Sequence, residues 1–155
     1  MSRVQLALRV SDLEGSIAFY TKLFNTEPAK LRPGYANFAI AEPPLKLVLI
    51  EGDAEQPTVM DHLGVEVFSS DEVTAAATRL ADAGLVTLTE ADTTCCYAVQ
   101  DKVWVHGPGN EPWEVYTVKA GADNLANADD SVCCAAAPGS TEHPGTLVAA
   151  PSSCC

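Results

Sequence analysis

Two segments of the chain begin with alternating apolar and polar residues and continue with an apolar period typical of a helix. Residues 5–10 and 62–67 place an apolar side chain at every second position, which is the pattern of a strand with one buried face. The helical stretches that follow repeat apolar residues every three or four positions, at Leu13, Ile17, Tyr20 and Phe24 in the first and at Val73, Ala77 and Leu80 in the second. Each segment therefore predicts a strand followed by an amphipathic helix.

These two segments repeat each other, because Gln5–Val10 aligns with His62–Val67 at an offset of 57 residues. A serine precedes a glutamate by three positions before each helix, Ser11 in the first segment and Ser69 in the second. This spacing predicts a capping box at the start of both helices. Gly84 marks the expected end of the second helix. The agreement at strand, cap and helix favours a duplicated unit over a chance similarity.

Further strands are predicted after each helix, at 35–40 and 46–50 in the first unit and at 85–89, near 97, at 102–106 and at 112–118 in the second. The turn at 107–110 predicts a hairpin between the last two. We therefore expect an α+β fold of two βαβββ modules, at about 1–55 and 58–119, which together form one domain with a cupped mixed sheet.

The last part of the sequence, residues 120–155, differs from this body in composition. From Gly121 onward it contains no Lys, no Arg and no aromatic residue, and few large apolar ones. Such a segment cannot bury enough apolar surface to offset the entropy of ordering its backbone. We predict a flexible, cysteine-containing tail.

Charge and hydropathy exclude several classes of partner. The net charge of -12 argues against nucleic acid and anionic membranes, whose binding requires Lys and Arg. No apolar run approaches the roughly 20 residues that a membrane-spanning helix needs. The start of the sequence lacks the basic and apolar regions of a signal peptide, so a cytoplasmic protein with reduced thiols is expected.

The alternation of the strands places three polar residues on the face opposite the helices. Gln5 and His62 occupy equivalent positions in the two modules, and Glu114 lies on one face of the last strand together with Tyr116. If the modules pack about a pseudo-twofold axis, an imidazole, a carboxylate and an amide oxygen meet there and predict a site for a divalent Fe, Mn, Ni or Zn ion. The alternative is that the histidine is structural and that Gln5 and Glu114 are solvated surface residues.

Cysteines occur in three adjacent pairs, Cys95–Cys96, Cys133–Cys134 and Cys154–Cys155. Neighbouring Cα atoms lie about 3.8 Å apart, below the usual disulfide range of about 4.4 to 6.8 Å. Two reduced thiols instead form a soft chelate for trivalent arsenic or cadmium. A loop over residues 91–95 would let the first two thiols converge. The alternative for that pair is two small, packed residues that are adjacent by chance.

The two modules, the positions of Gln5 and His62, and the ending His106-Gly-Pro-Gly-Asn-Glu-Pro-Trp-Glu114-Val-Tyr together resemble the vicinal oxygen chelate superfamily of glyoxalases, antibiotic resistance proteins and extradiol dioxygenases. That resemblance implies that Gln5, His62 and Glu114 bind the metal. With Cys95–Cys96 added, the sequence resembles the ArsI-type carbon–arsenic lyases and the cadmium-induced CadI proteins. This implies Fe(II), dioxygen as co-substrate, a trivalent organoarsenical held by the thiols, and arsenite as product.

The valence of arsenic agrees with such a substrate. A monosubstituted trivalent arsenical, methyl or aryl, has two bonds left for two thiolates, whereas arsenite would require a third sulfur. Two other functions stay open, a thiol-based cadmium- or metalloid-binding protein and a glyoxalase-like isomerase, although the few basic residues disfavour a glutathione site. His106 and Tyr116 are weaker candidates for acid–base support of the metal ligands, and His143 has no assigned role.

Overall fold

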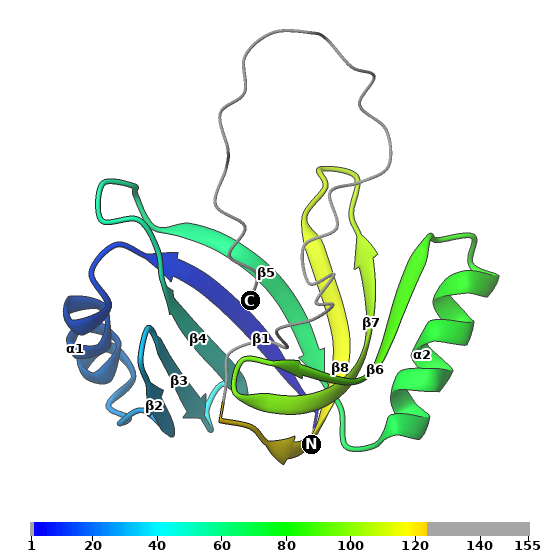
Figure 1. The fold of residues 1–155 in the computed structure, drawn as a ribbon, viewed down its shortest axis with the longest axis horizontal. Coiled ribbons are helices and arrows are strands. Elements are labelled where there is room, and N and C mark those ends of the chain that lie inside the picture. The colour runs from blue at the N-terminus through cyan, green and yellow to red at the C-terminus, as the bar shows by residue number, and fades with distance from the viewer. Residues whose placement is uncertain (1, 124–155) are drawn as a thin grey trace, which may run out of the picture.

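The computed structural model describes residues 2–123 (Figure 1). The first module contains β1 (Arg3–Val10), α1 (Leu13–Phe24), β2 (Lys30–Arg32), β3 (Tyr35–Ile40) and β4 (Leu45–Glu51). The second contains β5 (Val59–Glu66), α2 (Ser70–Asp82), β6 (Thr87–Cys95), β7 (Ala98–His106) and β8 (Pro112–Gly121). The prediction of two βαβββ modules is confirmed. No helix among the described residues is long and apolar enough to cross a membrane.

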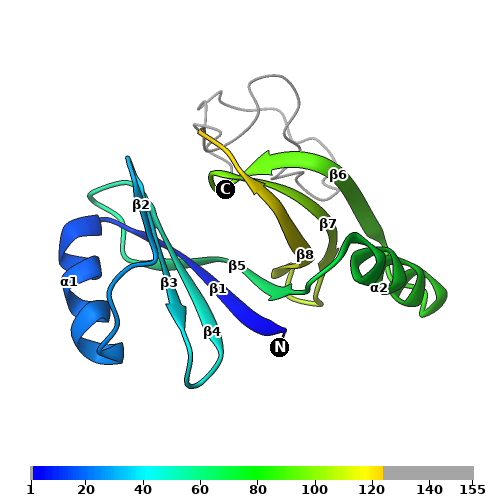
Figure 2. The same ribbon diagram turned by 90° about the horizontal axis from the view of Figure 1, so that it is seen from below.

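All eight strands form one sheet, in the order β2-β3-β4-β1-β5-β8-β7-β6. The antiparallel pair β1 and β5 joins the modules at its centre, and each of these strands pairs in parallel with the last strand of its own module. The sheet curls into a half-barrel with both helices on the outside (Figures 1 and 2). The concave face is therefore lined by strands of both modules.

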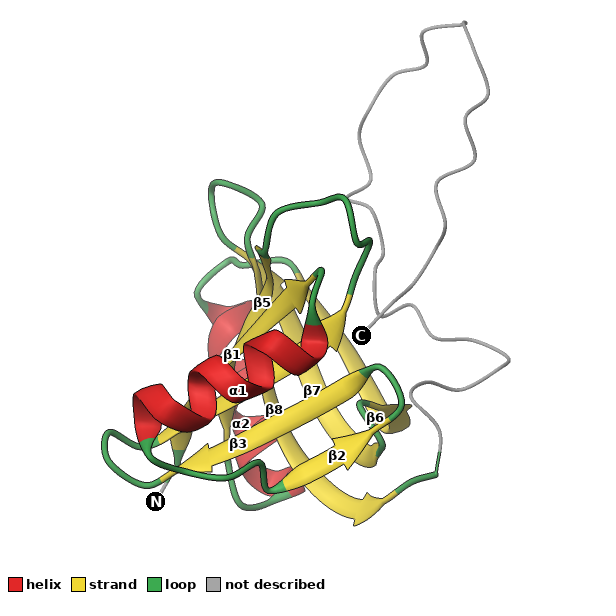
Figure 3. Ribbon diagram, turned by 90° about the vertical axis from the view of Figure 1, so that its left-hand side faces the viewer, coloured by secondary structure: helices red, strands yellow, loops and turns green. Residues whose placement is uncertain are grey.

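Each helix packs its predicted apolar stripe against the convex face of its own module. Leu13, Ile17, Tyr20 and Phe24 of α1 pack on a core cluster that includes Phe38, Leu47 and Leu49. Figure 3 shows α1 lying across the strands of the first module. In the second module, Val73 and Leu80 pack on Val103 as predicted, together with Ala76 and the partly buried Ala77. Because these contacts use the alternate positions of the strands, the other positions face the concave side.

The start of the first helix differs from the prediction. Asp12, not Ser11, caps α1, and its Oδ1 accepts a hydrogen bond from the backbone N–H of Gly15 at 2.8 Å. A carboxylate satisfies that free N–H and also interacts favourably with the positive end of the helix dipole. Ser69 caps the second helix as predicted, and Gly84 follows the end of that helix with a φ of +80°.

The strands around the second module's cysteines also differ from the prediction. Strand β6 extends to Cys95, so residues 91–95 belong to the sheet and not to a loop, with a register shift between Glu90 and Thr93. The short edge strand β2 was not predicted, and β8 continues to Gly121. The rest of the predicted tail, residues 124–155, lies outside the described residues.

Candidate functional site

Three neighbouring strands bring Gln5, His62 and Glu114 together at the centre of the concave face. Gln5 of β1 lies opposite Gly64 of β5, which in turn lies opposite Glu114 of β8, and His62 precedes Gly64 by two positions on the same face. The exposed fractions of the three side chains are 3%, 4% and 2%. The arrangement that the alternation predicted is therefore present, in a buried setting.

The spacing of the three side chains suits one metal ion. Gln5 Nε2 lies 3.0 Å from His62 Nε2 and donates to Glu114 Oε1 at 2.7 Å, and His62 Nε2 lies 3.4 Å from Glu114 Oε1. Ligands about 2.1 Å from an octahedral metal and at right angles to each other lie about 3.0 Å apart. The Gln5 amide presents its nitrogen to the other two residues, so binding through Oε1 requires the amide to rotate. Among residues 2–123 no cluster of three His, Cys, Asp or Glu side chains has the arrangement of a metal site, and this candidate depends on the glutamine.

Because Gly64 has no side chain, it leaves space for the side chains of Gln5 and Glu114 on either side. A Cβ placed there would lie 3.1 Å from Glu114 Cγ, 3.3 Å from Gln5 Cβ and 3.3 Å from Tyr116 Cε1. Contacts of this length are tighter than most side chains tolerate. Glycine at the central position therefore allows the two neighbouring side chains to converge.

Asp61 fixes the orientation of the His62 ring. His62 Nδ1 lies 2.7 Å from Asp61 Oδ1, and Arg9 pairs with the other carboxylate oxygen at 2.5 Å. Burial lowers the pKa of His62, but the hydrogen bonds to Asp61 and Glu114 outweigh it and raise the pKa to about 9. When Nδ1 donates to Asp61, neutral His62 directs the lone pair of Nε2 to the candidate metal position.

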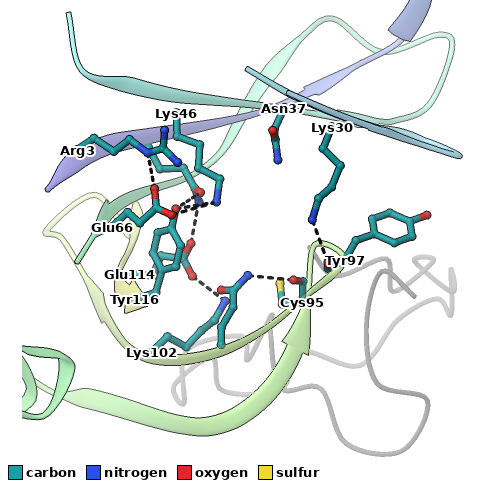
Figure 4. A network of polar contacts seen from close by, with 12 residues as sticks. Arg3, Lys30, Asn37, Lys46, Glu66, Cys95, Tyr97, Lys102, Glu114 and Tyr116 are labelled. Atoms are coloured by element: carbon teal, nitrogen blue, oxygen red, sulfur yellow. Dashed lines mark hydrogen bonds and ion pairs between the residues drawn. The ribbon is translucent and has the colours of Figure 1, made fainter. Parts of the chain in front are cut away.

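A buried lysine neutralises the carboxylate of Glu114. Lys102 Nζ donates to Glu114 Oε2 at 2.7 Å, and the side chains are 1% and 2% exposed. Burial raises the pKa of Glu114, but the Lys102 ammonium, followed by His62, outweighs it and lowers the pKa to about 2. Because Lys102 engages Oε2, Glu114 presents a single oxygen, Oε1, to the centre of the site (Figure 4).

Tyr116 belongs to the same network. Its hydroxyl donates to Gln5 Oε1 at 2.5 Å and accepts from Lys46 Nζ at 3.0 Å. The other weak candidate, His106, is exposed at the end of β7. Lys46 and Lys102 were not predicted as site residues. Each is a single cation beside an apolar strand run, and that position was the signal in the sequence that could have identified them.

The cysteine pair lies at the turn between β6 and β7 and faces the same concave side. Cys95 Sγ and Cys96 Sγ are 3.5 Å apart, and the two residues are 2% and 9% exposed. Cys96 carries a free thiol whose pKa burial raises to about 12. Cys95 is disulfide-bonded in this structure, whereas both thiols were expected to be reduced.

Strand β7 connects the cysteines to the carboxylate. Gln100 Nε2 donates to the carbonyl of Cys95 at 2.9 Å, and Lys102, two positions further on the same face, donates to Glu114. Two residues span about 7 Å along a strand. The turn that carries the cysteines and the three-residue cluster thus belong to one site, and Figure 4 shows Cys95, Lys102 and Glu114 on the same concave side. His143 and the pairs Cys133–Cys134 and Cys154–Cys155 lie outside the described residues.

Comparison with known proteins gives the family. Residues 3–115 match the model of the Glyoxalase/Bleomycin resistance protein/Dioxygenase superfamily. A protein of Thermomonospora curvata named trivalent organoarsenical cleaving enzyme is 73% identical over 134 residues, which cover 86% of this chain and 89% of that protein. Cadmium-induced protein CadI of Mycobacterium tuberculosis is 58% identical over 143 residues, covering 86% of this chain and 93% of that protein.

Solved structures agree with the fold. An extradiol ring-cleaving dioxygenase of B. fuscum has a TM-score of 0.58 at 20% identity, covering 79% of this chain and 34% of that chain. The Mn(II)-bound glyoxalase of Novosphingobium aromaticivorans has a TM-score of 0.56 at 20% identity, covering 83% of this chain and 44% of that one. The resemblance noted in the sequence is confirmed, and the chain belongs to the Glyoxalase/Bleomycin resistance protein/Dioxygenase superfamily.

Proposed function

We propose that this protein is an enzyme that cleaves the carbon–arsenic bond of trivalent organoarsenicals, with Fe(II) and dioxygen, and releases arsenite. The observation that carries the proposal is a buried cysteine pair and a buried Gln–His–Glu cluster on one concave face. Relatives at 73% and 38% identity, both named trivalent organoarsenical cleaving enzyme, support it.

In this proposal Cys95 and Cys96 capture the substrate. A monosubstituted arsenical carries two hydroxyl groups on arsenic; each condenses with one thiol, so that two As–S bonds form and two water molecules leave. The raised pKa of Cys96 keeps its proton available for the departing hydroxyl. Cys95 is disulfide-bonded in this structure, so capture requires prior reduction. The remaining arsenic valence is the bond to carbon.

Gln5, His62 and Glu114 would hold the metal. Fe(II) held there would supply the binding and activation of dioxygen, which protein side chains cannot provide. Asp61 keeps the His62 ring oriented, and Lys102 binds Glu114 Oε2, so that Glu114 would contact the metal through Oε1 alone. The Trp104 ring packs edge to face against the His62 ring, with the ring centroids 5.5 Å apart. The protein's contribution is therefore to position the carbon–arsenic bond beside the metal.

Metal and oxygen dependence test this proposal. Reduced protein is loaded anaerobically with Fe(II), mixed with methyl- or phenylarsenous acid, and then exposed to oxygen. We expect protein that retains about one iron per chain to release arsenite and to consume oxygen. Metal-free and Zn(II)-loaded protein should do neither. Arsenite release without oxygen would contradict the proposed chemistry.

A second function, thiol-based binding of cadmium or metalloids, is favoured by the same cysteine pair and by the relative named for its induction by cadmium. Such a protein would bind phenylarsine oxide or Cd(II) and consume no oxygen. The glyoxalase-like isomerase that the sequence left open would be recognised by turnover of a glutathione adduct without arsenic. The oxygen electrode therefore separates the first function from both others.

A further inference from the structure

The turn that carries the cysteines has an unusual backbone. Cys95 pairs with Ala98 across the hairpin, which leaves Cys96 and Tyr97 as a two-residue turn with φ values of 54° and 58°. Such turns favour Asn and Gly, because other residues pay a steric cost in the left-handed region. A turn without either residue at these positions is stable when surrounding contacts hold it.

One contact is the hydrogen bond from the backbone N–H of Ala122 to the Tyr97 carbonyl oxygen at 2.9 Å. The side-chain contacts come from the first module, on the opposite side of the cup. Lys30 Nζ of edge strand β2 donates to the carbonyl oxygen of Tyr97 at 3.1 Å, and the Tyr97 hydroxyl donates to the carbonyl oxygen of Pro33 at 2.9 Å. The rings of Tyr35 and Tyr97 lie 5.5 Å apart. Figure 4 shows the Lys30 side chain reaching from the first module to the turn.

Apolar packing joins the same two regions. Cys95, Cys96 and Tyr97 belong to one buried cluster with four residues of the first module, Ala7, Tyr35, Val48 and Ile50. The cysteines are therefore supported by strands of the first module, which are distant from them in sequence. This packing resists displacement of the turn but is not directional, whereas the two hydrogen bonds of Lys30 and Tyr97 fix its orientation.

We propose that Lys30 is a positioning residue for arsenical capture, whose ammonium group holds the Tyr97 carbonyl so that the left-handed Cys96–Tyr97 turn keeps both sulfurs aligned for one arsenic atom. This inference rests on the proposed function. Without Lys30 the turn samples other conformations, and capture by two thiols loses the advantage of a preorganised pair. Binding through a single thiol does not depend on that alignment.

The test is a double-mutant cycle between Lys30 and the thiol pair, with phenylarsine oxide as the probe. All variants are full-length, fully reduced, and carry Ser at the four tail cysteines, Cys133, Cys134, Cys154 and Cys155. Lys30→Met is measured in this background and in a Cys95→Ser background, where two-thiol capture is impossible. Lys22→Met, at an exposed lysine in the last turn of α1, is the matched control.

We expect Lys30→Met to weaken phenylarsine oxide binding about tenfold when both thiols are present, and to have no effect in the Cys95→Ser background. Tyr97→Phe should give a smaller loss in the same direction, and Lys22→Met none. The urea midpoint and the iron content of Lys30→Met should stay close to those of the parent.

Equal binding by Lys30→Met and its parent would overturn the inference, as would an equal loss in both backgrounds, because a general structural role produces the latter. A parent that binds phenylarsine oxide no more tightly than its Cys95→Ser variant would overturn two-thiol capture itself, and the inference with it. The two failures are therefore distinguishable.

Discussion

Glu114 and Lys102 form a buried ion pair on the concave face. Both groups are almost completely buried and 2.7 Å apart. Glu114→Gln should lower the free energy of unfolding of the metal-free protein by about 3 kcal/mol, because it leaves the Lys102 ammonium buried without a carboxylate. Adding Lys102→Met should restore most of that stability, as measured by urea unfolding. A double variant as unstable as Glu114→Gln would contradict this.

His62 makes the stability of the metal-free protein depend on pH. Its pKa in the folded state is about 9, above the 6.5 of an unfolded chain, so its protonated form is stabilised by folding. This contribution is fully present below pH 6.5 and is lost as the pH rises through about 9. Urea midpoints measured between pH 6 and 9.5 should fall, and less so in Asp61→Asn. An equal slope in both proteins would show that Asp61 does not hold the proton.

The sequence located some of these residues and missed others for a physical reason. Gln5, His62 and Glu114 could be located from the period of two and from the repeat. The period of two is reliable because backbone geometry makes successive side chains of a strand point to opposite faces. Lys102 and Asp61 were missed because alternation does not distinguish a solvated charge from a buried pair. That distinction depends on which strands become neighbours, and the order of the sheet is a long-range property.

At the scale of elements, β5 separates the two strands that carry Gln5 and Glu114. Gly64→Ala should weaken Fe(II) binding about tenfold or more, since the added Cβ displaces the flanking side chains. Overpacking should cost about 1 to 3 kcal/mol of stability. Gly52→Ala is the control, because a Cβ there meets its neighbours at 3.5 Å or more. Unchanged iron affinity in Gly64→Ala would show that the side chains flanking Gly64 do not need this space to bind the metal.

The elements themselves were predicted well where one face is buried and poorly elsewhere. The predicted strand at 85–89 ended too early, because most residues of β6 are exposed or half-buried on both faces and no apolar period marks them. The edge strand β2 has three residues and no buried side chain. For α1, the serine–glutamate spacing predicted a cap at Ser11, but the carboxylate of Asp12 accepts from the free N–H of Gly15 instead.

At the scale of the whole molecule, the end of β8 supports the cysteine turn. The backbone N–H of Ala122 donates to the carbonyl oxygen of Tyr97 at 2.9 Å, three residues beyond the domain boundary predicted at Lys119. We expect a reduced chain ending at Asp123 to keep the stability and turnover of the full-length protein. A chain ending at Lys119 should bind phenylarsine oxide more weakly, as competition titration would show. Equal phenylarsine oxide affinity of the two shortened chains would show that the Ala122–Tyr97 hydrogen bond has no role in binding.

If two thiols beside a metal capture the substrate, a site without these thiols should not release arsenite. The double variant Cys95→Ser, Cys96→Ser is loaded with Fe(II), and its release of arsenite from methylarsenous acid in air is compared with that of the wild-type protein. We expect unchanged iron content, because Gln5, His62 and Glu114 are intact, together with a loss of nearly all turnover. Arsenite release at the wild-type rate would contradict two-thiol capture.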